Sequence, residues 1–188
     1  MNAALDLKTE ELLAQAAAWR LASLLLERPR PGWPDEIETL SCEVTDRELS
    51  AYARETGDGT EETYHRLFGP GGIVSPREVS YCGFEDPGRL MAELNAFYRA
   101  FWFEPRREEP IDHISVETGF VGYLFLKEAY AGLRRSRDAT EITRSARERF
   151  TNEHVLRCAD GIIGRLDDSS PALQQVCLWL LKKAGGGR

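Results

Sequence analysis

The stretch HISVETGFVGYLFLKEAYAGL (residues 113–133) decides the fold that the sequence predicts. Its apolar side chains do not keep to one stripe but cover nearly the whole circumference of the helix that it would form. A helix of that kind needs neighbours on every side, so it belongs in the middle of a bundle. No stretch of the chain alternates apolar and polar residues over the length of a strand. The sequence therefore predicts an all-α fold, with this helix among its most buried segments.

Helix signals surround this central stretch. Apolar residues recur at helical spacing between Thr9 and Arg28, and Pro29 ends that helix. Further helices are expected to begin near residues 35, 45, 60, 86, 140 and 170, and the one from 140 should run to Leu166. The expected N-caps are Thr45 (in a capping box with Glu48), Thr60, Asp86, Asp112 and Ser170. These signals predict at least seven helices and no sheet.

Two irregular stretches interrupt the helices. GPGGIVSPREVSYCGFE (69–85) is a long loop for a compact domain, so it is expected to be functional or mobile and to become ordered when a partner binds. FEPRREEPID (103–112) is rich in charge and is closed by Pro110. We expect one domain over residues 1–188, a single bundle or two closely packed lobes, with the loop at 103–112 as the candidate boundary between lobes.

Composition limits the functions open to the chain. Its 188 residues carry a net charge of −7, which argues against a general nucleic-acid binder and suits a ligand rich in arginine or lysine. Four scattered cysteines indicate reduced cytosolic thiols, not a disulfide framework. The acidic start is not a secretory signal, and the longest strongly apolar run, Leu21 to Leu26, is too short to span a bilayer. A cytoplasmic protein without stable membrane insertion is expected.

Signals for catalysis are weak. His113 and Glu117 lie four residues apart, but the repeated Glu-x-x-His of carboxylate-bridged iron bundles does not occur, and no metal is expected. No GxSxG occurs, and Cys158 near His154 is better explained as a buried thiol. The cluster of glycines at 69–72 lacks the GK[ST] ending of a phosphate loop.

The aromatic residues expected in the core are Trp19, Trp33, Trp102 and Trp179, whereas Tyr81 and Phe84 of the long loop are the expected exceptions.

The segment Glu109-Pro110-Ile111-Asp112-His113, with Glu117 beyond it, is the best candidate site. Pro110 stiffens the loop, and Asp112 is placed to accept hydrogen bonds from the first-turn amides. His113 sits at the positive end of the helix, which disfavours its protonation. Glu117 projects from an almost entirely apolar helix, where a carboxylate is costly unless it is paired or lines a cleft. On these residues alone, a cap with one paired glutamate and a binding site explain the pattern equally well.

Three segments resemble the TorD/DmsD family of redox-enzyme maturation chaperones. EPIDHISVETGFVGYL (109–124) resembles its Glu-x-Pro-x-Asp-His junction, and YHRLFGPGGIVSPREVSY (64–81) looks like its Tyr-x-x-Leu-Phe helix end, glycine-containing loop and Ser-Pro-x-Glu-Ser-x-Tyr. RFTNEHVLRCADGIIGRL (149–166) is similar to its late helix with a Glu-His-Leu centre. The chain departs at Ser80, displaced by one position, and at Cys158, near which many members have tryptophan. The segment 75–90 looks closest to chaperones of the dimethylsulfide, ethylbenzene, chlorate and selenate enzyme group.

This resemblance implies an all-helical chaperone without catalytic activity. Such a protein binds the twin-arginine signal peptide and the unfinished body of a molybdopterin oxidoreductase catalytic subunit, and delays export until the cofactor is in place. The resemblance also implies no resident cofactor, weak binding of guanine nucleotide, and a monomer or a domain-swapped dimer. The client-binding residues that it suggests are Tyr64, Leu67, Phe68, Ser75, Pro76, Glu78, Tyr81, Glu109, Pro110, Asp112, His113 and Glu117.

Two other functions compete with this one. The first is a helical adaptor or regulatory protein that binds another partner, and the second is an enzyme that uses His113 with Asp112 or Glu117 as an acid–base pair. A chaperone should show an elongated groove beside the junction of Asp112 and His113, lined by carboxylates and apolar side chains, because its ligand has arginines and an apolar stretch. If the Glu117 carboxylate binds an arginine of the client peptide, Glu117→Gln should weaken peptide binding.

Overall fold

The described part of the chain is helical. The computed structural model describes residues 6–56, 61–105, 108–166 and 171–185, and within them it has no strand, only one isolated bridge between Arg77 and His113. The helices are α1 (Leu7–Leu26), α2 (Trp33–Glu43), α3 (Arg47–Thr56), α4 (Glu61–Phe68), the 3₁₀ turn η1 (Glu78–Tyr81), α5 (Pro87–Ala100), α6 (Ile114–Leu133), α7 (Arg137–Phe150), the π turn η2 (Thr151–Val155), α8 (Leu156–Ile163) and α9 (Pro171–Gly185). The predicted all-α fold is confirmed.

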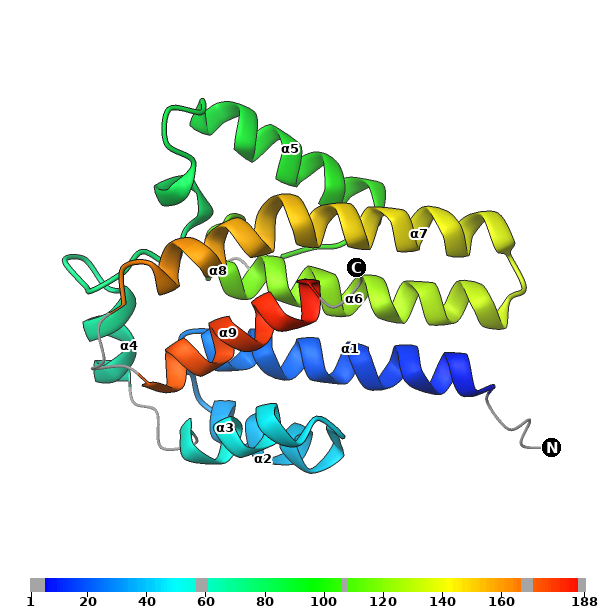
Figure 1. The fold of residues 1–188 in the computed structure, drawn as a ribbon, viewed down its shortest axis with the longest axis horizontal. Helices are drawn as coiled ribbons and strands as arrows, with labels where there is room; N and C mark the ends of the chain where they lie inside the picture. The colour runs from blue at the N-terminus through cyan, green and yellow to red at the C-terminus, as the bar shows by residue number, and fades with distance from the viewer. Residues whose placement is uncertain (1–5, 57–60, 106–107, 167–170, 186–188) are drawn as a thin grey trace.

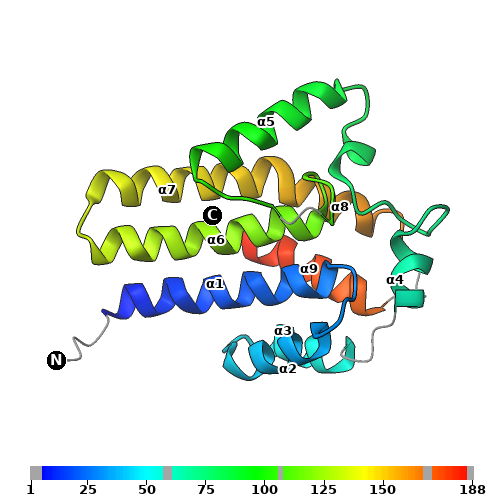
Figure 2. The ribbon, with the colours of Figure 1, turned by 180° about the vertical axis from the view of Figure 1, so that it is seen from behind.

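Helix α6 lies at the centre of the bundle. It runs antiparallel to α1 on one side and to α7 on the other, while α2 and α3 cover the far side of α1 and α5 packs against both α6 and α7 (Figures 1 and 2). Helix α9 crosses beside α1 and α8. Ile114, Phe120 and Leu124 of α6 are completely buried. The prediction that this helix belongs in the middle of a bundle is therefore confirmed.

Two glycines let α1 and α6 approach closely. A Cβ atom at Gly122 would lie 3.2 Å from the backbone oxygen of Ala16, and one at Gly119 would lie 3.0 Å from Ser23 Oγ. The Ser23 hydroxyl donates a 2.8 Å hydrogen bond to the backbone oxygen of Ser115. Because neither position carries a side chain, α1 and α6 can approach to this distance. The larger cavity described below opens beside this contact.

An aromatic cluster forms the core on the α5 side of α6. The ring of Phe120 lies 4.7 Å from Phe150, 4.9 Å from Tyr98 and 5.1 Å from Phe103, measured between centroids. Trp19, Trp33 and Trp179 are buried, as predicted. The same prediction is wrong for Trp102, whose side chain is 86% exposed. Trp102 follows the end of α5 with a φ of 58°, and this left-handed turn directs its side chain outward.

Several helix starts differ from prediction by one or two residues. The carboxylate of Asp6 accepts a hydrogen bond from Thr9 N, so α1 begins at Leu7. Asp46, not Thr45, caps α3 by accepting a hydrogen bond from Leu49 N. Asp86 caps α5 as predicted. All three caps are aspartates, which are among the favoured N-cap residues. The expected caps Thr60 and Ser170 lie outside the described residues.

The helix expected from 140 to 166 is interrupted. It begins earlier, at Arg137, and contains the π turn η2 between α7 and α8. There the backbone N–H of Leu156 donates to the oxygen of Thr151, five residues earlier. A π turn accommodates one more residue than an α-helical turn, which shifts the faces of the two flanking helices relative to one another. Phe150, His154 and Cys158, which lie on both sides of this turn, are all buried.

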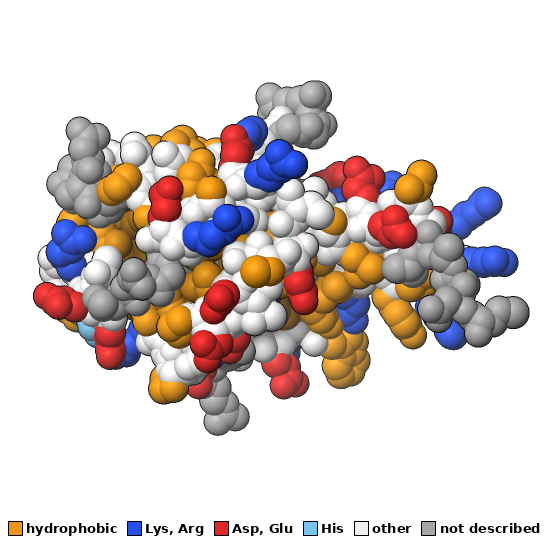
Figure 3. Space-filling view, turned by 90° about the horizontal axis from the view of Figure 1, so that it is seen from below, with side chains coloured by type: hydrophobic (Ala, Val, Ile, Leu, Met, Phe, Trp, Pro, Cys, Tyr) orange, Lys and Arg blue, Asp and Glu red, His pale blue; other side chains and the backbone are white. Residues whose placement is uncertain are grey.

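Buried apolar side chains on both sides of the 103–112 loop belong to one continuous cluster, so no break in the core marks a boundary between lobes there. The four cysteines are free. No helix within the described residues has the length and apolar character needed to cross a membrane. On the face seen in Figure 3, acidic, basic and apolar side chains are interspersed.

Candidate functional site

Two segments singled out in the sequence meet at the start of α6. The backbone N–H of Ile114 donates to the oxygen of Pro76 at 2.8 Å, and that of Glu78 donates to the oxygen of Asp112 at 2.9 Å. These bonds form the isolated bridge between Arg77 and His113. The loop before η1 is therefore fastened to the junction between the 103–112 loop and α6, although the two are far apart in sequence.

Asp112 holds this connection together but does not cap α6. Its buried carboxylate accepts hydrogen bonds from Arg77 Nε at 2.9 Å and from Val79 N at 3.4 Å. The cap is His113, whose Nδ1 accepts from Ser115 N at 3.1 Å. The predicted capping role of Asp112 is wrong because its side chain turns away from the first turn of α6 toward the guanidinium of Arg77.

His113 continues into a buried polar chain. Because Nδ1 accepts from Ser115, the ring proton sits on Nε2, which lies 2.9 Å from the Tyr64 hydroxyl. Tyr64 in turn donates to Glu109 Oε1 at 3.3 Å. Burial, and after it the charge of Arg77, lowers the pKa of His113 to about 3. The ring is therefore neutral at physiological pH and acts as a cap and connector.

Glu78 and Glu117 lie in the interior. Glu78 contacts His154 Nδ1 at 3.1 Å and Arg157 Nη1 at 3.4 Å. The carboxyl group of Glu117 receives no hydrogen bond from a donor among the described residues, and its polar neighbour is the carboxyl group of Glu78. Burial, followed by the nearby charge of Glu78, raises the pKa of Glu117 well above its ordinary value. A completely buried Glu117 cannot contact a client arginine in this conformation, contrary to the expectation from sequence.

Glu117→Gln is now expected to stabilise the protein increasingly as the pH rises. The folded state retains the Glu117 proton while the unfolded chain releases it above about pH 4.5, so the parent loses stability as the pH rises toward the higher folded-state pKa. Glutamine is neutral at every pH and has no such loss. Urea unfolding at pH 5 and pH 8 measures the effect. Peptide binding should remain unchanged.

The matched control for this comparison is Glu11→Gln, an exposed glutamate on α1. Its difference from the parent should be small and the same at both pH values, because an exposed carboxylate is solvated equally in the folded and unfolded chain. Equal pH dependence of the parent and Glu117→Gln would show that Glu117 is ionised in the folded protein.

Seven of the predicted residues line a smaller cavity of about 530 Å³. Leu67 is buried in the core, Pro76 is buried, and Phe68 packs edge-on against His113 with 6.1 Å between ring centroids. The Tyr81 hydroxyl donates to the backbone oxygen of Ser75 at 2.6 Å. Residues that line this cavity include Tyr64, Phe68, Ser75, Pro76, Glu109, Pro110 and His113. Most of the predicted set is thus brought together, while Leu67, Glu78, Tyr81, Asp112 and Glu117 lie outside its lining.

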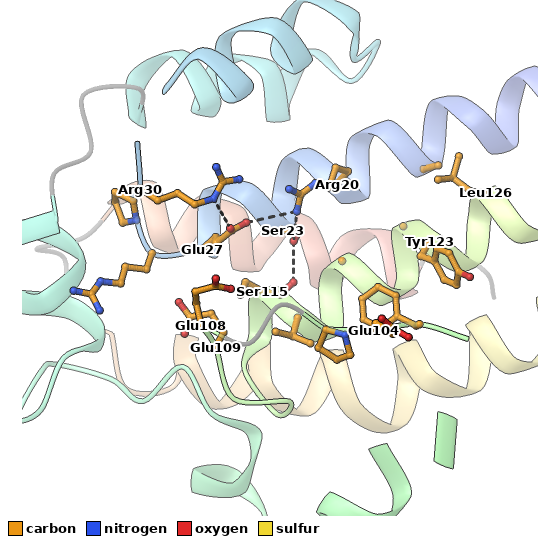
Figure 4. A pocket seen from close by; sticks show the side chains of 18 of the residues that line it. Arg20, Ser23, Glu27, Arg30, Glu104, Glu108, Glu109, Ser115, Tyr123 and Leu126 are labelled. Carbon is orange, nitrogen blue, oxygen red and sulfur yellow. Dashed lines mark hydrogen bonds and ion pairs between the residues drawn. The ribbon is translucent and has the colours of Figure 1, made fainter. Parts of the chain in front are cut away.

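A larger cavity of about 1060 Å³ shares Glu109 with the smaller one (Figure 4). Its walls are α1 with the segment that follows it, the loop that precedes α6, and the exposed face of α6. Glu109 is the one predicted site residue in its lining. The sequence analysis missed the contribution of α1, because nothing in the local pattern shows which loop the end of a helix will face.

One end of this cavity is rich in charge. Glu27 forms ion pairs with Arg30 at 3.0 Å and with Arg20 at 3.6 Å. Figure 4 shows Glu108 and Glu109 facing Glu27 across the opening. The side chains of Glu27 and Glu109 are only 11% and 12% exposed, and burial raises the pKa of Glu109. Partly desolvated carboxylates of this kind attract a guanidinium strongly.

The other end is apolar. Its lining includes Phe103, Val116, Tyr123 and Leu126, with Gly119 and Gly122 between them where α1 and α6 approach. Glu27 and Glu109 lie near the start of α6, whereas Tyr123 and Leu126 lie towards its end (Figure 4). The Tyr123 hydroxyl donates to the backbone oxygen of Phe101 at 3.0 Å, which fixes its ring against the loop. The cavity therefore offers carboxylates at one end and an apolar surface at the other.

Comparison with protein families gives a match over most of the chain. The family described as "Nitrate reductase delta subunit" matches residues 33–162, from the start of α2 almost to the end of α8. The chain belongs to this family. Comparison with curated proteins finds no match.

The nitrate reductase delta subunit family consists of chaperones that mature molybdoenzymes, and the TorD-type resemblance is confirmed at this level. Its members act as chaperones and not as catalysts. The matched region contains the loop before α6 and α6 itself, which form one wall of the larger cavity. The wall from α1 lies outside the matched region.

Proposed function

We propose that this chain is a cytoplasmic chaperone that binds the twin-arginine signal peptide of a molybdopterin oxidoreductase catalytic subunit. It also holds the unfinished body of that subunit and delays export until the cofactor is inserted. The observation that carries the proposal is the cavity of about 1060 Å³ in a molybdoenzyme chaperone, with carboxylates at one end and an apolar floor at the other.

The chemistry of the ligand supports this placement. A twin-arginine signal peptide presents two guanidinium groups followed by an apolar stretch. Glu27, Glu108 and Glu109 supply acceptors for bidentate contacts to guanidinium, and Tyr123 and Leu126 supply an apolar surface beyond them. The volume is sufficient for several residues of an extended or helical peptide, though not for a whole domain.

The arginines already in the cavity indicate how a peptide would enter. Arg20 and Arg30 approach Glu27 within the cavity, and Arg28 forms an ion pair with Glu61 at its edge. Glu27 and Glu61 thus already accept guanidinium groups, which supports the proposal. A client arginine would replace an internal one, so binding is an exchange between cations and its net strength is modest.

Glu109→Gln and Glu108→Gln are each expected to weaken binding of a synthetic peptide with an Arg-Arg pair and an apolar stretch. Loss of a charge-assisted hydrogen bond costs about 1.5–3 kcal/mol, or roughly ten- to a hundred-fold in affinity. Calorimetry at low salt measures it, because screening is then weakest. A peptide with Lys-Lys should bind more weakly than the parent peptide, since lysine cannot form the bidentate contact.

Glu11→Gln on α1 serves as the charge-matched control and should bind like the parent. If the parent binds the peptide and both variants bind it equally well, the cavity is not the arginine-reading site. If the parent does not distinguish the Arg-Arg peptide from one with Gln-Gln, signal-peptide binding itself is excluded.

A further inference from the structure

Three potential metal ligands converge where α5 meets the π turn η2, away from both cavities. Glu93 comes from α5, and Glu153 and His154 come from η2. One ligand atom from each of the three lies within 4.8 Å of the others. Carboxylate oxygen and imidazole nitrogen are the donors that borderline divalent cations such as Zn²⁺ accept in proteins.

The state of His154 points to a missing ligand. The ring is almost completely buried, and its Nδ1 lies 3.1 and 3.2 Å from the two carboxylate oxygens of Glu78. Its Nε2 is also buried and has no hydrogen-bond partner among the described residues. Leaving a buried polar atom unpaired is costly, so a partner for this nitrogen is expected. Since Nδ1 is turned toward Glu78, Nε2 is the atom left for an ion.

Glu78 completes an arrangement typical of metal-binding histidines. Such histidines usually donate their other ring N–H to a carboxylate, which fixes the tautomer and the orientation of the ring. With the Nδ1 proton directed to Glu78, the Nε2 lone pair is available. The backbone adds a second indication, because π turns are rare and are often found at functional sites.

A cation already occupies the space between the two carboxylates. Arg149 contacts Glu153 Oε2 through Nε at 2.7 Å and Glu93 Oε1 through Nη2 at 3.2 Å. The Arg149 side chain is 59% exposed, so it can rotate into solvent and leave its place to an ion. A metal would therefore bind by displacing a guanidinium.

We propose that Glu93, Glu153 and His154 form a binding site for a divalent transition-metal ion, with Zn²⁺ as the probe that fits its donors. Tetrahedral ligands about 2.0–2.2 Å from zinc lie roughly 3.3–3.6 Å apart. The glutamate side chains, 35% and 44% exposed, are free to close in on the fixed Nε2 atom. Water would supply the remaining coordination. Because α5 diverges from α7 toward its own start (Figure 2), an ion here would tie α5 to the rest of the bundle.

The test is calorimetric titration of the full, chelator-treated chain with Zn²⁺ alone. We expect saturation at one ion per chain. Glu93→Gln and Glu153→Gln should each weaken binding by at least about tenfold. Even residues that only hydrogen-bond to a metal ligand have effects of this size when they are mutated. Arg149→Gln should strengthen binding by at least about tenfold, because it removes the competing cation that contacts both carboxylates. All three side chains are partly exposed at the surface, so the variants should fold.

Glu141→Gln, on the exposed surface of α7, is the control and should bind Zn²⁺ like the parent. The proposal is overturned if Arg149→Gln leaves the affinity unchanged, or if the double variant Glu93→Gln/Glu153→Gln binds as tightly as the parent. It is also overturned if alkylation of the cysteines abolishes binding, since the ion would then sit on thiols such as the exposed Cys42.

Discussion

Phe120→Ala is expected to lower the free energy of unfolding by about 3–5 kcal/mol, the range for removal of a buried phenylalanine ring. Phe120 is completely buried and lies between α5, α6 and α7, with Phe150, Tyr98 and Phe103 packed around it. These neighbours come from three elements, so they cannot close the space without moving helices. Urea unfolding followed by circular dichroism measures the loss.

The matched control is Phe84→Ala, which removes an equally large ring from a fully exposed position and should leave the free energy of unfolding within about 0.5 kcal/mol of the parent. Phe103 and Tyr123 line the larger cavity and pack against Phe120. Peptide affinity should therefore fall in Phe120→Ala even where the protein remains folded. A small stability change would mean that the aromatic cluster repacks freely.

The pH dependence of stability should contain a large contribution from His113. The pKa of His113 is about 3 in the folded protein against an ordinary value of 6.5. Below pH 6.5 the unfolded chain takes up a proton that the folded chain does not, so stability is complete above this pH and is lost as the pH falls toward 3. The slope is about 1.4 kcal/mol per pH unit. Glu109, 3.5 Å from Nε2, favours the charged ring, but burial outweighs it.

His113→Asn isolates this contribution. Asparagine is a favourable N-cap, so it can retain the hydrogen bond to Ser115 N without titrating. Its free energy of unfolding should fall less steeply than that of the parent between pH 6 and pH 4. His65→Asn, at an exposed position, should follow the parent. Parallel curves for the parent and His113→Asn would show that the ring is protonated in the folded protein.

The features that the sequence predicted correctly are those that depend on local pattern. The apolar circumference of α6 is sufficient to place it at the centre of the bundle, and Asp86 with Pro87 is sufficient to start α5. Helix periodicity and capping act over a few residues, so they can be recognised without knowledge of the neighbours. The same reasoning does not distinguish Thr45 from Asp46, because both are competent caps within one residue of the observed start.

The candidate site was predicted only in part, because its geometry is non-local. The sequence indicates that Glu117 is unusual, but its burial depends on how α6 packs against Glu78 and Asp112. Asp112 turns to Arg77, and only the folded chain brings Arg77 there. The opposition of Glu27 to Glu109 joins the first helix to a loop in the middle of the chain. No spacing rule relates such residues.

The π turn η2 has a consequence for changes in chain length. Each residue advances an α-helix by about 100°, and the additional residue of η2 sets the angular phase between α7 and α8. Deleting one residue there, such as the exposed Asn152, would restore an ordinary helical turn and rotate the following segment by about that angle. Cys158 and Ile162, now facing the core, would be carried toward solvent. Substitutions in this turn and a deletion within it are therefore different kinds of mutation: the former act locally, while the latter shifts the phase of every helical residue up to Ile163.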